Sequence, residues 1–454
     1  MAAGLPGPAD CAALAVAELD AAVSAPVRFQ GQHGVVSKAQ GEQLLQQLEG
    51  NTASHAMLRT HLAYEQSVAI DSPLLIGNKV TLLQNGPITH EAMFEAIRAA
   101  TDHINLETYI FDDGKLGKQF AALLLEKQAS GVQVSVLYDS VGGLLTPQSF
   151  FDRLREGGIA VLEFNPVNPL AKNPKTWEMN HRDHRKLIVI DGRIAFIGGV
   201  NISDSYSSSP AVKSSSDGKH PEADEDDGWR DTHIQLEGPV VAEFQRLFLD
   251  TWARHAGALP MRQYFPELPA QGDEIVRAIG SRADVKASPI YMTLVSAITR
   301  AKTEINLTVA YFGPDPTLLK AMTGAAQRGV KVRMVLPSYT DSAAIFHLGR
   351  SHYTKLLRAG VEIHERHGAV MHAKTAVIDG VWSTIGSSNL DWRSYLHNDE
   401  ISAVVLGGEF AGQMNAMFAE DVAESEQIQL AEWRHRSWWL RIKERVARVG
   451  AYWL

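Results

Sequence analysis

The sequence predicts an α/β protein built from two related α/β domains. Two stretches rich in β-branched residues, Val132–Tyr138 and Val330–Leu336, have the pattern of buried strands. Each follows a helical stretch that ends at a glycine, Gly131 or Gly329. Alternation of helix and strand along one chain is typical of α/β folds. An internal repeat indicates that the pattern occurs twice.

The internal repeat relates Ala92–Phe111 to Thr293–Phe312, 201 positions later, with seven of 20 positions identical. This period is far longer than that of solenoid repeats, so we expect duplication of a whole domain. The boundary between the copies should lie near Gly257–Gly272, where prolines cluster. We therefore expect a first domain over residues 71–260 and a second over residues 261–454.

The segments outside the repeat have a simpler character. The first 70 residues are rich in Ala, Gln and Leu, with Leu44, Leu45 and Leu48 at helical spacing, so we expect residues 1–70 to form a helical extension. Residues Ser203–Asp227 contain serine triplets and end in a run of carboxylates. We interpret them as a solvated loop, because no ligand spacing there requires a cation.

The composition indicates a globular protein and limits the kinds of partner that it can bind. The 454 residues are 45% hydrophobic and 21% charged, as in ordinary globular proteins. Lys and Arg number 43 against 52 Asp and Glu, a net charge of −9, so nucleic acid is not the expected partner. The single cysteine, Cys11, excludes an internal disulfide framework. No apolar run approaches the roughly 18 residues of a membrane span, so we expect any membrane contact to be peripheral.

A sharper motif occurs once in each copy. His184–Asn201 and His372–Asn389 match at nine of 18 positions without a gap. The shared frame is His-x-Lys-x4-Asp, then six residues, then Gly-[Gly/Ser]-x-Asn. Two copies in one frame, each with the same continuation, are far more specific than one. Two ordinary buried hairpins are the alternative interpretation, but burying two Lys and two His without a function is costly.

The spacing within the motif predicts its geometry. On a strand, residues i and i+2 point to the same face, so His184 and Lys186 should lie side by side, as should His372 and Lys374. The Asp-Gly steps that follow are typical of tight hairpin turns. The motifs' closing residues should then return beside the His-Lys ends of their hairpins. These motif-closing residues are Asn201 and Asn389.

An imidazole, an ammonium and an amide around one small space suit a phosphoryl group. Lys offers a point charge, Asn offers N–H donors, and His can attack phosphorus or transfer protons. With two copies, one histidine can be the nucleophile while the other serves the leaving group. The two lysines can offset the charge that develops during transfer, so we expect neither a catalytic metal nor another cofactor.

These motifs resemble those of the phospholipase D superfamily, and most closely those of bacterial cardiolipin synthases of that type. The stretches Asn180–Gly192, Leu106–Phe111, Asp139–Gly142 and Trp229–His233 support that subfamily. The resemblance begins at about Asp71 and implies a bilobal pseudo-dimer with one active site at the domain interface. Some synthases of this group begin with transmembrane helices, and this sequence is more similar to the shorter, peripheral kind.

The resemblance also implies roles for individual residues. His184 would be the nucleophile of a phosphohistidine mechanism, and His372 would protonate the leaving alcohol and deprotonate the incoming one. The lysines and asparagines of the motifs would hold the phosphate oxygens. Downstream acids would orient the histidines, and the motif aspartates at the hairpin turns would be structural. The candidates for orienting the histidines are Asp231 and Glu400. The structural aspartates of the hairpin turns are Asp191 and Asp379.

The function implied is a phosphatidyltransferase that joins two phosphatidylglycerol molecules and releases glycerol. A phospholipase D hydrolase, with water as acceptor, would use the same residues. A nucleic-acid phosphodiesterase is disfavoured by the net charge of −9, and a non-catalytic lipid-binding module by two complete motifs. We expect a cytoplasmic enzyme, peripheral on the inner face of the cell membrane. The oligomeric state is left open.

Two further features bear on the site and on the membrane. His181, Asp183 and Glu107 flank the predicted strands, where they either line the pocket or are solvated. Residues 433–454 carry six basic side chains and one acid, and their apolar residues recur at helical spacing. This segment is either an interfacial helix on anionic lipid or a helix docked on the protein core.

Overall fold

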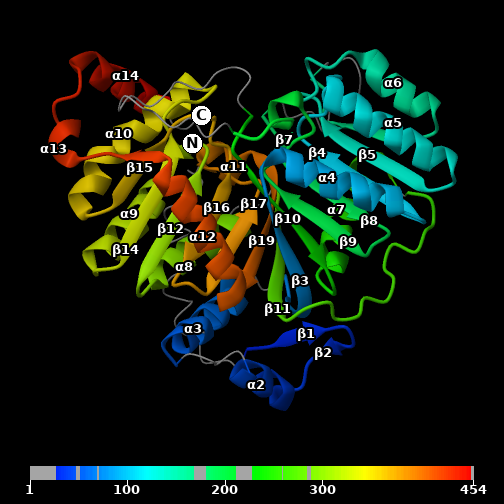
Figure 1. The fold of residues 1–454 in the computed structure, drawn as a ribbon, viewed down its shortest axis with the longest axis horizontal. Coiled ribbons are helices and arrows are strands. Elements are labelled where there is room, and N and C mark those ends of the chain that lie inside the picture. The colour runs from blue at the N-terminus through cyan, green and yellow to red at the C-terminus, as the bar shows by residue number, and fades with distance from the viewer. Residues whose placement is uncertain are drawn as a thin grey trace, which may run out of the picture.

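The fold of the computed structural model agrees with the predicted α/β class. The model describes residues 27–47, 52–68, 71–167, 180–210, 228–257, 259–283 and 288–450. Two mixed sheets stand side by side in the middle of the molecule, with helices on their outer sides (Figure 1). Among the described residues, no helix combines the length and apolar character needed to cross a bilayer.

The sheet of the first half has three parallel strands at one side and antiparallel strands elsewhere. From edge to edge its strands are β3 (Leu74–Gln84), β10 (Thr232–Glu237), β9 (Ile194–Gly198), β8 (Leu187–Ile190), β4 (His103–Thr108), β5 (Gln133–Asp139) and β6 (Ala160–Phe164).

The second half repeats this order. Its strands are β11 (Glu274–Ser281), β19 (Asn398–Leu406), β17 (Trp382–Gly386), β16 (Lys374–Ile378), β12 (Glu304–Val309), β14 (Lys331–Pro337), β15 (Glu362–Arg366) and the added edge strand β20 (Ser425–Gln427). Strands β3 and β11 pair antiparallel and join the sheets. The identical order confirms duplication of a whole α/β unit.

Helices cover the sheets in corresponding places. In the first half these are α4 (Asn85–Ala99), α5 (Lys115–Ala129), α6 (Gln148–Glu156) and α7 (Val241–Ala256). Their counterparts are α8 (Pro289–Arg300), α9 (Pro316–Gln327), α10 (Ala343–Ala359) and α12 (Gly408–Ala423). The apolar core between the halves includes Ile197, Ile234, Phe244, Ile385 and Phe410. It binds the two sheets, α7 and α12 into one body, which fixes the motifs relative to each other.

The N-terminal extension packs against the second half. It contains α2 (Lys38–Gln47) and α3 (Thr52–Val68), and Leu45 lies in the core cluster that also holds residues of α8 and α9. It also contains a strand pair that the helical pattern did not predict, β1 (Phe29–Gly31) with β2 (Gly34–Val35). Strand β1 pairs parallel with β3, and this long-range pairing decides its conformation. Leu48 lies outside the described residues.

The remaining elements are short and lie mostly at the ends of the sheets. They are β7 (Arg182–Asp183), the 3-10 turn η1 (Asp204–Tyr206), β13 (Phe312–Gly313), β18 (Leu390–Asp391), α11 (Trp392–Leu396), α13 (Leu430–Trp433) and α14 (Trp438–Val449). Helix α7 ends at Ala256 and β11 begins at Glu274, so the predicted boundary region is irregular in structure. Most of the predicted loop Ser203–Asp227, from residue 211 on, lies outside the described residues.

Both Asp-Gly steps form the predicted tight turns. Asp191 and Gly192 have φ of 53° and 63°, and Asp379 and Gly380 have φ of 54° and 62°. Two consecutive residues with positive φ match the twist of a hairpin, and Asp and Gly tolerate that conformation best. The turns connect β8 to β9 and β16 to β17.

Candidate active site

The first motif histidine lies where the two halves meet. His184 follows β7, which pairs with β19 of the second half, and its amide donates to the carbonyl oxygen of Asp399 at 2.9 Å. Its Nδ1 lies 3.1 and 3.2 Å from the carboxylate oxygens of Glu400. The Glu400 side chain is fully buried, whereas that of His184 is 12% exposed. The first half thus supplies the imidazole and the second half the carboxylate.

His372 has the corresponding position in the second half. Its amide donates to the carbonyl oxygen of Arg230 at 2.8 Å, and its Nδ1 lies 2.7 Å from Oδ2 of Asp231. The hydroxyl of Tyr206 lies 3.0 Å from the same nitrogen. Each histidine is therefore held by an acid from the other half. With Nδ1 engaged by a carboxylate, Nε2 of each ring is the nitrogen available for chemistry.

The motif lysines lie beside their histidines. Nζ of Lys186 donates to the carbonyl oxygen of His184 at 2.6 Å, and Nζ of Lys374 donates to that of His372. Burial lowers the pKa of Lys186 to about 7 and that of Lys374 to about 8, although Glu400 and Asp231 respectively oppose the shift. The charge of Lys374 lowers the pKa of Lys186 further, so an anion that offset this charge would stabilise the ammonium form.

Burial sets the charge of both histidine–acid pairs. Burial and then Lys186 lower the pKa of His184 to about 4, so its imidazole is neutral at pH 7. Burial, Lys374 and Lys186 lower the pKa of His372 well below its ordinary value. Burial raises the pKa of Asp231 to about 6. For Glu400 burial is outweighed by His184, by the charge of Lys186 and by a hydrogen bond from Ser387, which lower the pKa to about 2. Glu400 is therefore the more firmly ionised acid.

The motif asparagines are buried at the returning ends of the hairpins. Nδ2 of Asn201 donates to the hydroxyl of Tyr206 at 3.2 Å, which connects it to the ring of His372. Oδ1 of Asn389 is buried without a hydrogen-bond partner in the part of the chain that is described. The Gly-Gly step before Asn201 has a steric reason, because a Cβ on Gly199 would lie 2.1 Å from Oδ1 of Asp231.

The motif aspartates stand at the opposite ends of their hairpin strands, away from the imidazoles. Asp191 accepts from the amides of Thr101, Asp102 and His103 at 2.8–2.9 Å. Asp379 accepts from the corresponding amides in the second half, which include that of Thr303 at 2.7 Å. These contacts support the structural role that the hairpin pattern predicts. They fasten each turn to the start of a neighbouring strand.

Two comparisons of sequence bear on the family. The model of a family described as "Cardiolipin synthase, PLD-like domain" matches residues 93–209 and again residues 294–422. A cardiolipin synthase of Halalkalibacterium halodurans is 32% identical over 90% of this chain and 77% of its own length. Cardiolipin synthase A of Pseudomonas syringae is 34% identical over 83% of this chain and 75% of its own length.

This chain belongs to the cardiolipin synthase family. Its two phospholipase D-like segments fall in the two halves of the fold, and each contains one histidine motif. A solved structure, phosphatidylserine synthase of Haemophilus influenzae, has the same fold with a TM-score of 0.60 and 11% identity, covering 85% of this chain and 96% of its own. The predicted family and the predicted duplicated fold are both confirmed.

In this family member, the structure brings all ten predicted site residues to the two hairpins or their facing strands. One detail of the prediction is wrong: β8 begins at Leu187, so His184 and Lys186 precede the strand rather than lie on it. The amide of His184 pairs with Asp399 across the interface, which takes it out of the ladder between β4 and β8. In the second motif Lys374 is the first residue of β16, whereas His372 precedes that strand as well.

Sequence reasoning missed several aromatic residues of the site. Tyr206 is buried in η1, at the start of the segment interpreted as a solvated loop. Ring centroids of Tyr109 and His184 are 5.0 Å apart, and those of Trp229 and His372 are 5.1 Å apart. Tyr109 also lies under Nζ of Lys186, with 5.3 Å to the ring centroid. Tyr109 and Trp229 lie in stretches that supported the family resemblance, and nothing else in the sequence indicated that these two residues belong to the site.

Of the three flanking residues, two are completely buried and His181 is partly buried. Nε2 of His181 lies 2.7 Å from Oδ1 of Asp399, and the Asp183 and Glu107 side chains are completely buried. Asp183 and Glu107 therefore neither line an open pocket nor face solvent. They surround the residue between the histidine and the lysine of the first motif, Arg185.

Proposed function

We propose that this protein is a phosphatidyltransferase that joins two phosphatidylglycerol molecules into cardiolipin and releases glycerol. The observation that carries the proposal is the pair of imidazoles, each held by a buried acid of the other half, with a buried lysine beside each. Membership in the cardiolipin synthase family supports the choice of phospholipid. No cofactor enters the proposed reaction.

In the first step, Nε2 of His184 attacks the phosphorus of one phosphatidylglycerol. The bond between phosphorus and the glycerol headgroup oxygen breaks, and His372 gives that oxygen a proton. In the second step, His372 takes the proton from a hydroxyl of a second phosphatidylglycerol, whose oxygen attacks the phosphohistidine and frees His184. Lys186, Lys374, Asn201 and Asn389 would hold the phosphoryl oxygens.

A general acid must carry a proton when the substrate is bound, and this requirement fits the charges of the site. Lys374 and Lys186 both lower the pKa of His372 in the free protein. A phosphodiester between these lysines would offset their charge and raise the pKa of His372. The neutral His184 would remain a nucleophile under the same conditions, because its Nδ1 is bonded to an ionised Glu400.

Product analysis tests the proposal. The purified full chain, incubated with phosphatidylglycerol vesicles, should yield equal amounts of cardiolipin and glycerol by mass spectrometry. Phosphatidic acid in place of cardiolipin would instead establish the hydrolase. Activity should persist in EDTA, since the lysines supply the positive charge. Loss of activity in EDTA that Zn²⁺ or Mg²⁺ restores would overturn the metal-free mechanism.

We further propose that residues 433–454 contact an anionic membrane surface, at the inner face of the cell membrane. Helix α14 packs on α10, and Glu444 is buried in a bidentate ion pair with Arg436. The apolar stripe points away from the protein instead: Trp438 and Trp439 are about 60% exposed and Val446 is 66% exposed. A helix that docks through its polar side and exposes tryptophans is suited to an interface with lipid.

A second apolar element lies on the first half. The loop after β5 exposes Leu144 and Leu145, which are 68% and 95% accessible. The loop passes close to the site, because a Cβ on its Gly142 would lie 1.9 Å from the carbonyl oxygen of Tyr109. Together with α14 it would present the site to headgroups from both halves.

Vesicle sedimentation tests the membrane proposal. Replacing Trp438 and Trp439 by Ser should weaken binding to phosphatidylglycerol vesicles by about tenfold or more, because two interfacial side chains are lost. Substitution is preferable to truncation, since Trp433 is buried against Tyr353. Met261, which is 99% exposed in the boundary region, offers a control, and Met261→Ser should bind normally. Unchanged binding of the double variant would show that α14 is not the anchor.

A further inference from the structure

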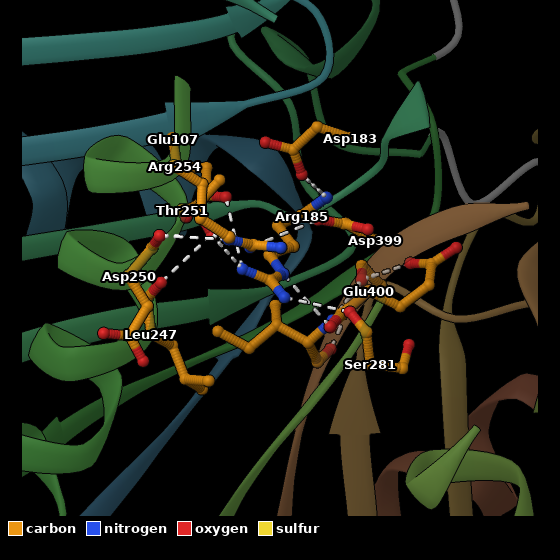
Figure 2. Close-up of polar contacts among 12 residues, drawn as sticks. Glu107, Asp183, Arg185, Leu247, Asp250, Thr251, Arg254, Ser281, Asp399 and Glu400 are labelled. Carbon is orange, nitrogen blue, oxygen red and sulfur yellow. Dashed lines mark hydrogen bonds and ion pairs between the residues drawn. The ribbon is translucent and has the colours of Figure 1, made fainter. Parts of the chain in front are cut away.

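Arg185 is a buried arginine that neither step of the proposed reaction uses. It stands between His184 and Lys186, where the second motif has Ala373, and is 1% exposed. Its guanidinium donates to three acceptors around the interface, as Figure 2 shows. They are the carbonyl oxygen of Glu400 at 3.2 Å, the carbonyl oxygen of Ser281 at 2.9 Å and the hydroxyl of Thr251 at 2.6 Å.

Three buried carboxyl groups surround this guanidinium. Oε1 of Glu107 lies 3.6 Å from Nη1, and Oδ1 of Asp183 accepts from the backbone amide of Arg185 at 3.1 Å. Asp399 is paired with His181 at 2.7 Å and Arg254 at 3.7 Å. Burial raises the pKa of Glu107 and of Asp183, and the neighbouring Glu107 raises the pKa of Asp183 further. A proton held by one of these two carboxyl groups would leave the cluster close to electrical balance with Arg185 charged.

The contact with Glu400 connects this cluster to the chemistry. Arg185 binds the backbone carbonyl of the residue whose carboxylate lies on Nδ1 of His184. At the other histidine, Nη1 of Arg230 in the first half donates to the carbonyl oxygen of its chain neighbour Asp231 at 2.6 Å. Each histidine-holding acid therefore has a guanidinium on its carbonyl. Arg230 is anchored by Asp421, and Arg185 by the buried carboxyl cluster.

We propose that Arg185 is a positioning residue for the first histidine. It holds the start of β19 against the first half, so that the Glu400 carboxylate stays aligned with His184. The buried carboxyl groups of Glu107, Asp183 and Asp399 keep the guanidinium charged and oriented. The inference rests on the proposed function only in taking His184 as the reacting group, and it holds whichever alcohol accepts the phosphoryl group.

The neighbouring cavity makes the proposal testable by chemical rescue. A cavity of about 460 Å³ is lined by Arg185 together with Leu247, Asp250, Arg254 and Gly280. Removal of the Arg185 side chain would leave a space that opens into this cavity. A small guanidinium ion can enter that space and replace the lost donors, whereas a lysine at this position offers one ammonium for three separated acceptors.

A matched control exists on β11. Arg277 is 2% exposed, donates to the carbonyl oxygen of Ser72 at 2.8 Å, pairs with Glu65 and lines a cavity of about 580 Å³. It is thus a buried, paired arginine beside a cavity of similar size. Its acceptors, Ser72 and Glu65 of α3, are not residues of the candidate active site. Arg277→Ala should reveal what the loss of any such arginine does.

The experiment measures hydrolysis of bis(4-nitrophenyl) phosphate, which reports the chemistry of His184 without a lipid. Arg185→Ala should lower kcat about 100-fold with little change in KM, the size of effect expected when a catalytic group is misplaced. Millimolar guanidinium should raise the kcat of Arg185→Ala about tenfold, while urea should leave it unchanged. Arg185→Lys should stay impaired. Arg277→Ala should lose thermal stability, keep its kcat and show no rescue.

Other outcomes would overturn the proposal. A folded Arg185→Ala enzyme with normal kcat would remove the positioning role, as would equal loss and equal rescue in Arg277→Ala. Arg185→Gln, which keeps more of the side-chain volume, serves the same test should the alanine variant fail to fold. If the wild type cleaved the nitrophenyl ester but made no cardiolipin, the proposed function would fail and the role of Arg185 would stand.

Discussion

The two halves share one strand order but hold their histidines differently. His184 is 12% exposed and bonded to Glu400, whose pKa is about 2, whereas His372 is 6% exposed and bonded to Asp231, whose pKa is about 6. Tyr206 adds a second contact to His372 and has no counterpart at His184 among the described contacts. Duplication thus produced two similar histidine–acid pairs. Their surroundings made His184 the more accessible histidine and Glu400 the more firmly ionised acid.

This difference supports a division of roles. A nucleophile needs access to phosphorus and a partner that stays ionised as its ring becomes positive, and His184 has both. A proton carrier needs a ring whose pKa responds to bound charge; both lysines lower the pKa of either ring, but His372 is paired with the weaker acid. The predictions below are ordered from the largest expected effect to the smallest.

Removing either imidazole should have the largest effect. His184→Ala and His372→Ala should each lower phosphatidyl transfer by about 10⁴-fold or more, because nucleophile and acid act as one unit. With a nitrophenyl ester the two should separate, since that leaving group departs without a proton. His372→Ala should then still form an acid-labile adduct on His184, detectable by mass spectrometry. An adduct on His372 instead would reverse the roles.

The two acids should differ in how much they matter. Glu400→Gln should lower kcat about 10³-fold, since Gln neither stabilises a positive ring nor holds the same tautomer. Asp231→Asn should lower kcat only about 10²-fold, because Tyr206 still contacts Nδ1 of His372. Rapid-quench measurement of adduct formation and decay would compare them. Equal losses would mean that the two sites are functionally equivalent.

The lysines should set the alkaline limit of activity. The pKa values of Lys186 and Lys374 are about 7 and 8 in the free protein, so each ammonium is lost as the pH rises through that range. The value of kcat/KM should therefore begin to fall above about pH 7 and fall more steeply above about pH 8, by up to tenfold per pH unit for each proton lost. Profiles of the wild type with a soluble phosphodiester check this. A profile that stays flat to about pH 10 would contradict it.

The turn aspartates should affect stability more than chemistry. Asp379→Asn should lower the free energy of unfolding by about 2–4 kcal/mol, and Asp191→Asn should lower it by about 1–2 kcal/mol. The larger value reflects an additional contact, since Nε2 of His61 lies 3.0 Å from Asp379 and both side chains are buried. Thermal unfolding of both variants measures the difference. A larger loss for Asp191→Asn would show that the N-terminal extension does not support the second turn.

The same aspartate gives a pH dependence with a defined sign. Burial raises the pKa of Asp379, but the hydrogen bonds from His61 and from backbone amides outweigh it and lower the pKa to about 2, below the ordinary value of 3.8. The stability that the carboxylate adds is therefore complete above about pH 4 and is lost as the pH falls towards 2. Asp379→Asn should flatten that part of the stability profile.

Local features of the fold and of the site could be predicted from the sequence. The Asp-Gly turns depend on residues next to each other, and Gly131 and Gly329 end their helices at positive φ for the same local reason. The repeated His-x-Lys spacing predicted the two reacting groups of the site. The repeat itself predicted that the two halves have the same topology.

Long-range pairing decided the rest. Glu400 and Asp231 were candidates, but which acid meets which histidine depends on contacts across 216 and 141 positions. Tyr206 and Arg185 gave no local signal, because each acts where the halves meet: β7 pairs with β19 beside Arg185, and Arg230 bridges to Met371 beside His372, the partner of Tyr206. The amphipathic pattern of α14 was visible in the sequence. Only the tertiary structure decided that its polar side is docked and its apolar stripe exposed, since Glu444 finds Arg436 and α10 against the protein.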